Sequence, residues 1–277
     1  MMLRLLTIFL SIALLGNAGA QTFGLYTYSV NADNVSVTIT DYPTDATGAI
    51  EIPATIDGRS VTSIGSSAFQ NCSSLTSVTI PNNVTSIGSS AFQNCSSLTS
   101  ITIGNSVTSI GAGAFYECTG LTSVTIPNSV ISIGESAFNS CRSLTSINIP
   151  NSVTSIGYEA FRDCTGLTSA TIGNSVTSIG SNVFFGCTSL ADVSLNSASA
   201  NWSNTNFYNY VTSINIPEDT VQIADNAFYG CSKVTSVNIP NSVTSIGNEA
   251  FRDCSGLTSI VVAADNPNYS SIGPLLL

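Results

Sequence analysis

The chain has 277 residues, of which only 8% are charged, with 16 Asp and Glu against 6 Lys and Arg. The mean hydropathy of +0.33 excludes a disordered chain, because such chains are highly charged and poor in apolar residues. The net charge of −10 argues against nucleic acids and anionic membrane surfaces as partners, since both are bound through basic patches.

Residues 1–20 have the three parts of a secretory signal peptide. Arg4 supplies the positive start, residues 5–15 form a short apolar stretch, and Ala18-Gly19-Ala20 matches a cleavage site. An N-terminal membrane anchor is the alternative, but the apolar stretch is short for a bilayer span. We therefore expect a secreted or cell-surface protein that starts near Gln21 and has no transmembrane segment after cleavage.

Residues 21–49 lack the periodicity of the rest of the chain. Within them, residues 26–30 and 35–40 alternate apolar and polar side chains on either side of the turn-rich Asn31-Ala32-Asp33-Asn34. This pattern is typical of a β-hairpin. We expect residues 21–49 to form a β cap at the N-terminal end of the repeats.

A repeat of 23 residues occupies residues 50–265. Phenylalanine marks it at Phe69, Phe92, Phe115, Phe138, Phe161, Phe184, Phe207, Phe228 and Phe251. Cysteine follows three residues later at Cys72, Cys95, Cys118, Cys141, Cys164, Cys187, Cys231 and Cys254. Between Phe207 and Phe228 the step is only 21 residues, and Tyr210 replaces the cysteine. Residues 190–217 therefore hold a degenerate coil.

Each coil contains the same local patterns. Val78-Thr79-Ile80 alternates inward and outward as a strand does, and residues 84–87 form a second short extended stretch. Residues 89–95 are predicted to form a helical or 3₁₀ turn that points its alanine, phenylalanine and cysteine inward.

Such a coil cannot bury its apolar face alone, so coils must stack. The period predicts an α/β repeat fold: a leucine-rich-repeat solenoid of about ten coils, with short parallel strands and short helical or 3₁₀ turns.

The string Ile149-Pro150-Asn151-Ser152-Val153-Thr154-Ser155-Ile156-Gly157, followed by Ala160-Phe161 and then Cys164, resembles the BspA-like leucine-rich repeat family. The resemblance covers about residues 50–270. It implies a secreted or surface protein that binds host matrix proteins, other cells or other microbes. The chain departs from leucine-rich repeats that carry an asparagine ladder, because Asn83 gives way to serine in later coils.

Residues 266–277 form a C-terminal tail in which no polar cap is obvious. An uncapped solenoid end is expected to fray or to associate.

Catalytic chemistry is not expected. The chain contains no histidine, which removes the usual general base and zinc ligand, and it has no nucleophile or phosphate-binding motif. Glu159 and Asp163 flank Arg162 in a pattern that predicts a solvated charged turn rather than a catalytic carboxylate pair. The same arrangement recurs around Arg252. We therefore predict no catalytic residues, no metal site and no cofactor.

The eight cysteines allow two interpretations. An even number in an exported chain suggests disulfides. However, side chains stacked at one slot point in parallel, which is poor disulfide geometry, and Tyr210 replaces one of them as a core residue can. Buried free thiols are the favoured interpretation.

The residue after each core phenylalanine is expected to point outward, forming a column up one edge of the solenoid. Its occupants are Gln70, Gln93, Tyr116, Asn139, Arg162, Phe185, Tyr208, Tyr229 and Arg252. Three consecutive coils place the aromatics Phe185, Tyr208 and Tyr229 there, between Arg162 and Arg252. Because aromatics and arginine are enriched at binding hot spots, these five residues are the candidate binding patch. The alternative is that the rings only stack and stabilise the rod.

Three functions remain open. The chain is expected to bind an extracellular protein or glycan in an adhesin-like role. It could instead be a passive structural stalk or matrix element, as its near-identical coils suggest. A minor alternative is an ice- or crystal-surface binder, because serine and threonine form a hydroxyl array at Ser77, Thr79, Ser100, Thr102, Ser123 and Thr125.

Overall fold

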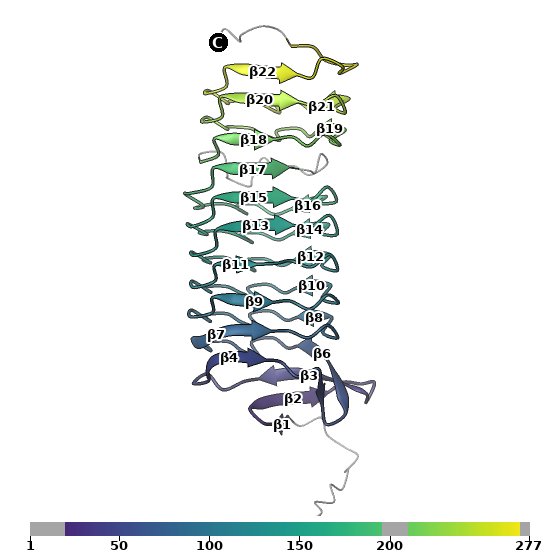
Figure 1. The fold of residues 1–277 in the computed structure, drawn as a ribbon, viewed down its shortest axis with the longest axis vertical. Helices are drawn as coiled ribbons and strands as arrows, with labels where there is room; N and C mark the ends of the chain where they lie inside the picture. The colour runs from purple at the N-terminus through teal and green to yellow at the C-terminus, as the bar shows by residue number, and fades with distance from the viewer. Residues whose placement is uncertain (1–19, 196–209, 272–277) are drawn as a thin grey trace, which may run out of the picture.

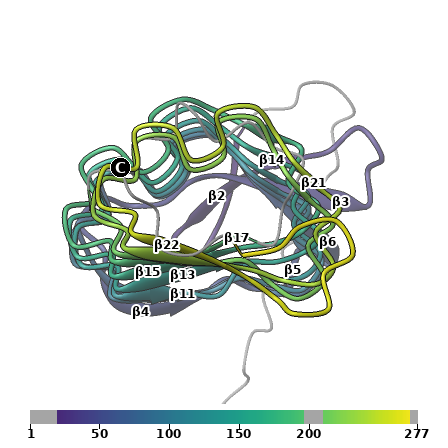
Figure 2. The same cartoon turned by 90° about the horizontal axis from the view of Figure 1, so that it is seen from above.

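The computed structural model describes residues 20–195 and 210–271, and within them every regular element is a β-strand. The coils stack into an elongated rod, with the N-terminal hairpin at one end and the last coil at the other (Figure 1). Viewed along the rod, the coils superimpose into one closed ring (Figure 2). The fold is a β-solenoid of about nine turns with parallel strands.

One side of the rod is built from the longer strands. They are β4 (Thr47–Glu51), β7 (Ser74–Thr79), β9 (Ser100–Thr102), β11 (Ser123–Val124), β13 (Ser146–Ile149), β15 (Ser169–Ile172), β17 (Asp192–Leu195), β18 (Ser213–Asn215), β20 (Ser236–Ile239) and β22 (Ser259–Val262). Neighbouring strands pair in parallel within three sheets, whose orders are β11-β9-β7-β4, β13-β15-β17-β18 and β20-β22.

A second side is formed by strands that, apart from β6, are two residues long. They are β6 (Arg59–Ile64), β8 (Ser86–Ile87), β10 (Ser109–Ile110), β12 (Ser132–Ile133), β14 (Ser155–Ile156), β16 (Ser178–Ile179), β19 (Gln222–Ile223) and β21 (Ser245–Ile246). A glycine follows most of these strands because the preceding coil passes very close. A Cβ added to Gly88 would lie 2.6 Å from the carbonyl carbon of Gly65.

The register of the strands reproduces the sequence period. Ser77 pairs with Ser100, and Val78 pairs with Ile101. The degenerate coil is visible in the same way, because Asp192 pairs with Ser213, a step of 21 residues. Phe207 lies outside the described residues.

The third side of each coil is a run of tight turns, so the expected helical or 3₁₀ turn is wrong. The N–H groups of Ser90, Phe92 and Asn94 donate to carbonyls of the next coil, whereas the residues between them donate three residues back. Ser90 and Asn94 also have positive φ angles, 55° and 61°. A helix requires negative φ and hydrogen bonds within its own segment, so the ladder between coils replaces it. The expected inward burial of alanine, phenylalanine and cysteine is nonetheless present.

The core is dominated by the phenylalanine ladder. From Phe69 to Phe184 the rings are fully buried and stack with centroids 4.9 to 5.7 Å apart. Phe228 continues the ladder, and Phe251 at the last coil is half-buried. Offset ring pairs of this kind add about 0.5–1.5 kcal/mol each beyond the burial of area.

The N-terminal hairpin covers the first coil. β1 (Gln21–Phe23), β2 (Tyr26–Val30) and β3 (Ser36–Asp41) pair antiparallel, β3 joins β6 in parallel, and β5 (Thr55–Ile56) pairs with β6. The hairpin expected at residues 26–40 is therefore present. The ring of Tyr42 lies 5.0 Å from that of Phe69, and Tyr26 packs on Tyr42. Aromatic side chains thus cover the exposed end of the ladder.

The tail carries polar contacts that the sequence pattern did not reveal. Asn266 Nδ2 donates to the carbonyls of Pro240 and Val243, at 2.8 and 3.0 Å. Tyr269 Oη accepts from Ile246 N–H, and Ser271 Oγ accepts from Val262 N–H. The expectation that no polar cap is present is corrected for residues 266–271, because these side chains satisfy backbone groups of the last coils.

Candidate binding surface

The column that follows the core phenylalanines lies on the turn side of the rod. Phe185 is 47% exposed, Arg252 is exposed, and Arg162 and Tyr229 are half-buried. Tyr208, the middle aromatic of the candidate patch, lies outside the described residues. The structure therefore places four of the five patch residues.

These four residues form two arginine–aromatic pairs across neighbouring coils. Arg162 Cζ lies 5.1 Å from the centre of the Phe185 ring, and Arg252 Cζ lies 5.9 Å from the centre of the Tyr229 ring. Cation–π contacts at exposed sites contribute about 0.5–1 kcal/mol. Each pair therefore holds a flat aromatic surface beside a positive charge on a chain that has few cations.

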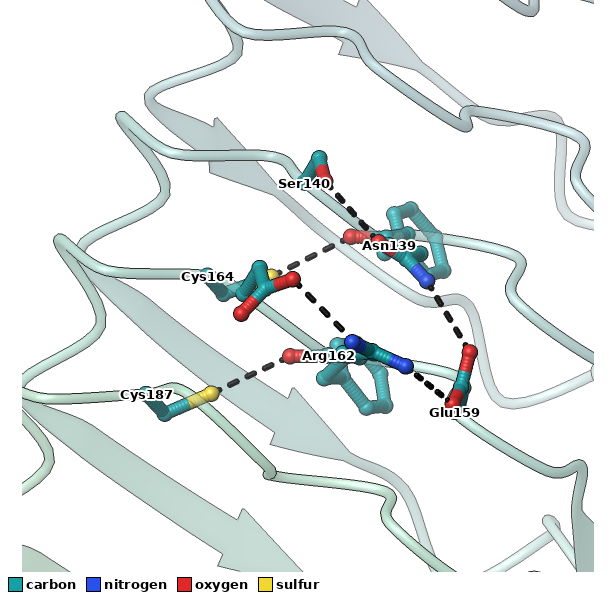
Figure 3. Close-up of polar contacts among 9 residues, drawn as sticks. Asn139, Ser140, Glu159, Arg162, Cys164 and Cys187 are labelled. Atoms are coloured by element: carbon teal, nitrogen blue, oxygen red, sulfur yellow. Dashed lines mark hydrogen bonds and ion pairs between the residues drawn. The ribbon is translucent and has the colours of Figure 1, made fainter.

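Carboxylates orient both arginines. Arg162 Nη1 donates to Glu159 Oε1 at 2.5 Å, and Arg162 Nε donates to Asp163 Oδ2 at 3.2 Å (Figure 3). Arg252 repeats the first contact with Glu249 at 2.8 Å. Fixing a guanidinium in this way lowers the entropy that it would lose on binding a ligand.

Glu159 is not the solvated group that the sequence predicts, since it is only 8% exposed. Asn139 Nδ2 lies 3.5 Å from Glu159 Oε2, and Glu159 Oε1 accepts a hydrogen bond from Arg162 Nη1 (Figure 3). Burial acts to raise the pKa of Glu159, but hydrogen bonds from Tyr158, Arg162 and Asn182 outweigh it and lower that pKa. The carboxylate is therefore charged at neutral pH and anchors this part of the column.

Asn139 departs from the expected outward orientation of the column. It is 5% exposed, and its amide oxygen accepts a hydrogen bond from Ser140 Oγ at 2.9 Å. Asn139 donates to Glu159, a buried carboxylate of the following coil that needs hydrogen-bond donors. The column is thus interrupted between Tyr116 and Arg162.

All eight cysteines are buried and free. Six of them donate from Sγ to the carbonyl of a phenylalanine in the preceding coil, for example Cys164 to Phe138 and Cys187 to Phe161, both at 3.1 Å (Figure 3). Burial raises the pKa of Cys141, and also that of Cys164. Cys141 and Cys164 are therefore neutral core groups with a defined hydrogen-bond acceptor.

The hydroxyl array occupies the face of the longer strands. Thr79, Thr102 and Thr125 are exposed, and the strands that carry the first two pair in register. A neighbouring threonine ladder runs along the same side, where Thr99 Oγ1 donates to the carbonyl of Thr76 at 3.0 Å and later threonines repeat the contact. These hydrogen bonds link coils and fix the threonine rotamers.

A surface hollow of about 350 Å³ was not anticipated from the sequence. It lies on the turn side and is lined by Gln93, Tyr116 and Glu135 together with small residues. In the sequence, this hollow corresponds to serine or glycine at one position of the repeat. That pattern is a weak indication, because the chain is rich in both residues. A second hollow of about 360 Å³ lies nearby and includes Asn94 and Glu117.

Among the residues that the structure describes, no three His, Cys, Asp or Glu side chains are grouped as a metal site would require. Over the same ranges, no helix is long and apolar enough to cross a membrane.

Comparison with known proteins identifies relatives of the fold. A leucine-rich repeat protein from T. pallidum superposes with a TM-score of 0.54 at 26% identity, covering 86% of this chain and 91% of that one. A leucine-rich cell surface protein from Faecalibacterium prausnitzii A2-165 gives a TM-score of 0.56 at 31% identity, covering 92% of this chain and 77% of that one. No curated protein matches the chain.

The family profile described as BspA type leucine rich repeat region matches residues 49–168 and 157–273, with 6 copies. Together the matched ranges include the strands from β5 to β22, the phenylalanine ladder and the cysteine ladder. The chain belongs to the BspA-type leucine-rich repeat family.

Proposed function

We propose that this chain is an exported, adhesin-like protein that binds an extracellular macromolecule through the patch containing Phe185, Tyr229, Arg162 and Arg252. The observation that carries the proposal is the pairing of each aromatic ring with an arginine held by carboxylates. Much of the surrounding surface consists of short serine and threonine side chains, so these four residues are among the large groups available for burial in an interface.

Family membership and the N-terminal sequence support export. One relative is described as a leucine-rich cell surface protein. Residues 1–20, whose pattern is that of a signal peptide, account for delivery across a membrane. The proposed role is non-catalytic, because the chain lacks histidine and carries no nucleophile motif.

The test compares the mature chain, residues 21–277, with the double variant Phe185→Ser and Tyr229→Ser. Proteins and glycans that the wild type captures from extracellular-matrix and cell-surface extracts are identified, and their affinities are then measured with purified components. We expect the double variant to bind at least about tenfold more weakly, since each factor of ten corresponds to about 1.4 kcal/mol.

Phe23→Ser is the matched control, because Phe23 is a comparably exposed aromatic, at 42%, in the N-terminal cap and away from the patch. Thermal melting of all variants separates loss of binding from loss of fold. If the double variant melts earlier but binds as well per folded molecule, the aromatic residues are structural and the binding site lies elsewhere.

A passive stalk is the second candidate function. The even stacking of the buried rings from Phe69 to Phe184 favours it, because such regularity needs no ligand. Failure of the wild type to retain any purified protein or glycan at micromolar concentration would support the stalk and contradict the binding proposal.

A further inference from the structure

The hollow beside Tyr116 owes its shape to one position of the repeat. That position, two residues after the conserved glycine, is Ser90, Gly113 and Ser136 in three successive coils, and all three have positive φ angles. Because the side chains at this position are small, they leave open space above the backbone. In the next coil the same position is Glu159, which is buried beneath Asn139 and Arg162. The residues that line the hollow therefore come from three coils, and the fourth carries a buried glutamate at the same position.

The walls of the hollow differ in chemistry. Gln93, Tyr116 and Glu135 line it together with the hydroxyls of Ser89, Ser90 and Ser136. Gln70 Nε2 donates to Gln93 Oε1 at 3.0 Å, which orients the Gln93 amide and leaves its nitrogen as a donor. Glu135 is exposed and supplies a carboxylate acceptor, while Tyr116 is half-buried. The hollow thus combines an aromatic ring, an amide donor and a carboxylate within three coils.

We propose that this hollow binds a neutral pyranose unit of a glycan. A sugar ring has a C–H face that packs on an aromatic side chain and equatorial hydroxyls that both donate and accept hydrogen bonds. Tyr116 supplies the first contact, and Glu135, Gln93 and the serine hydroxyls supply the second. The hollow, of about 350 Å³, is shallow and open, so it would hold one sugar unit against its surface without enclosing it.

Other ligand classes fit less well. An anionic group would meet Glu135 in a chain of net charge −10, and no lysine or arginine lines the hollow. An apolar helix would leave the serine hydroxyls and the carboxylate without partners, at a cost of about 1–3 kcal/mol for each buried polar group. A basic peptide remains as the competitor that the experiment must separate.

The site is distinct from the Phe185 patch, and each can fail without the other. The experiment screens the mature chain against an array of neutral hexose- and N-acetylhexosamine-containing oligosaccharides, then measures affinity for the strongest by calorimetry. We expect binding that weakens at least about tenfold in Tyr116→Ala, which corresponds to about 1.4 kcal/mol. Phe23→Ala, a control at an exposed aromatic of the N-terminal cap, and the variant with Phe185→Ser and Tyr229→Ser should bind the same glycan unchanged.

A second variant tests the hollow without removing the ring. Gly113→Gln places a long neutral side chain on the floor, and the chain itself shows that this backbone position accepts one, since Glu159 and Glu249 adopt the same positive φ. We expect this variant to fold and to lose glycan binding. Failure of the wild type to bind any neutral glycan would overturn the proposal, as would retained binding in both variants. Binding of basic peptides that disappears at high salt, without glycan binding, would overturn it in favour of a cationic ligand.

Discussion

The side chains of the phenylalanine ladder stack on one another from Phe69 to Phe184. Each inner ring is fully buried and is stacked on both faces by rings of neighbouring coils. Removing one ring leaves a cavity that the close-packed coils on either side can fill only in part. The ladder is therefore where a single substitution should have its largest effect on stability.

Phe138→Ala is expected to lower the free energy of unfolding by about 3–5 kcal/mol at most, with less loss if the adjoining coils relax into the gap. The measurement is the denaturant midpoint with its slope. Phe251→Ala is the matched control, because Phe251 is half-buried and should lose less. Equal midpoints for wild type and Phe138→Ala would contradict the assignment of this ladder to the core.

The cysteine thiols are expected to be reduced and protected in the native protein. Burial raises the pKa of Cys72 to about 12, and it also raises that of Cys141, so these thiols stay protonated at pH values where an ordinary thiol with a pKa near ~8.5 ionises. Thiol titration at pH 8 to 9 should therefore find little reaction before denaturation and nearly the full complement afterwards, without reductant. Absence of thiols after denaturation would favour disulfides instead.

At the scale of the element, the inward-pointing residues of a coil are carried by two kinds of backbone, strands and turns. Leu75 and Val78 are buried residues of β7, whereas Ala91, Phe92 and Cys95 point inward from successive turns. The turns are stabilised because alternate N–H groups donate to carbonyls of the next coil, so their conformation depends on the stacking of the coils.

The hydroxyl array on the longer strands is expected not to bind ice. Its outer column changes from threonine to Asn148 after Thr125 and to Ser194 later, and the adjoining threonines donate their hydroxyl hydrogens to backbone carbonyls. The regular exposed array is therefore short. The check is thermal hysteresis at micromolar protein, where we expect the melting and freezing points to coincide. A measurable gap between them would make surface binding the leading function.

At the scale of the whole molecule, the rod is a sum of coils that contact only their neighbours. Removal of one complete coil, residues 98–120, keeps the strand register, because Leu121 takes the place of Leu98. We expect this deletion to fold cooperatively with a somewhat lower denaturant midpoint, since it removes one coil's burial.

A deletion one residue shorter, residues 98–119, is the matched control. This variant leaves one coil a residue too long, and since coils with steps of 21 and 23 residues both pair in parallel, we expect the extra residue to bulge out and the denaturant midpoint to fall below that of the 23-residue deletion. Circular dichroism and denaturant melts of both deletions make the comparison. Similar behaviour of the two variants would show that the register does not couple the coils as the pairing indicates.

The sequence by itself determined the coil length, the inward residues and the family, because a strict repeat of apolar side chains permits only a stacked core. It located the short coil from the Phe207 to Phe228 step, and the pairing of Asp192 with Ser213 agrees. It also placed the two arginines beside their carboxylates, since those residues are close in the chain.

Only the tertiary structure decided features that depend on contacts between coils. The turn backbone was predicted as helical because local spacing cannot show that Ser90 and Phe92 donate to the next coil. The burial of Asn139 and Glu159 and the stacking of Arg162 on Phe185 likewise join residues of different coils. The hollow at Tyr116 arises from three small residues aligned along the rod, and their alignment exists only once the coils are stacked.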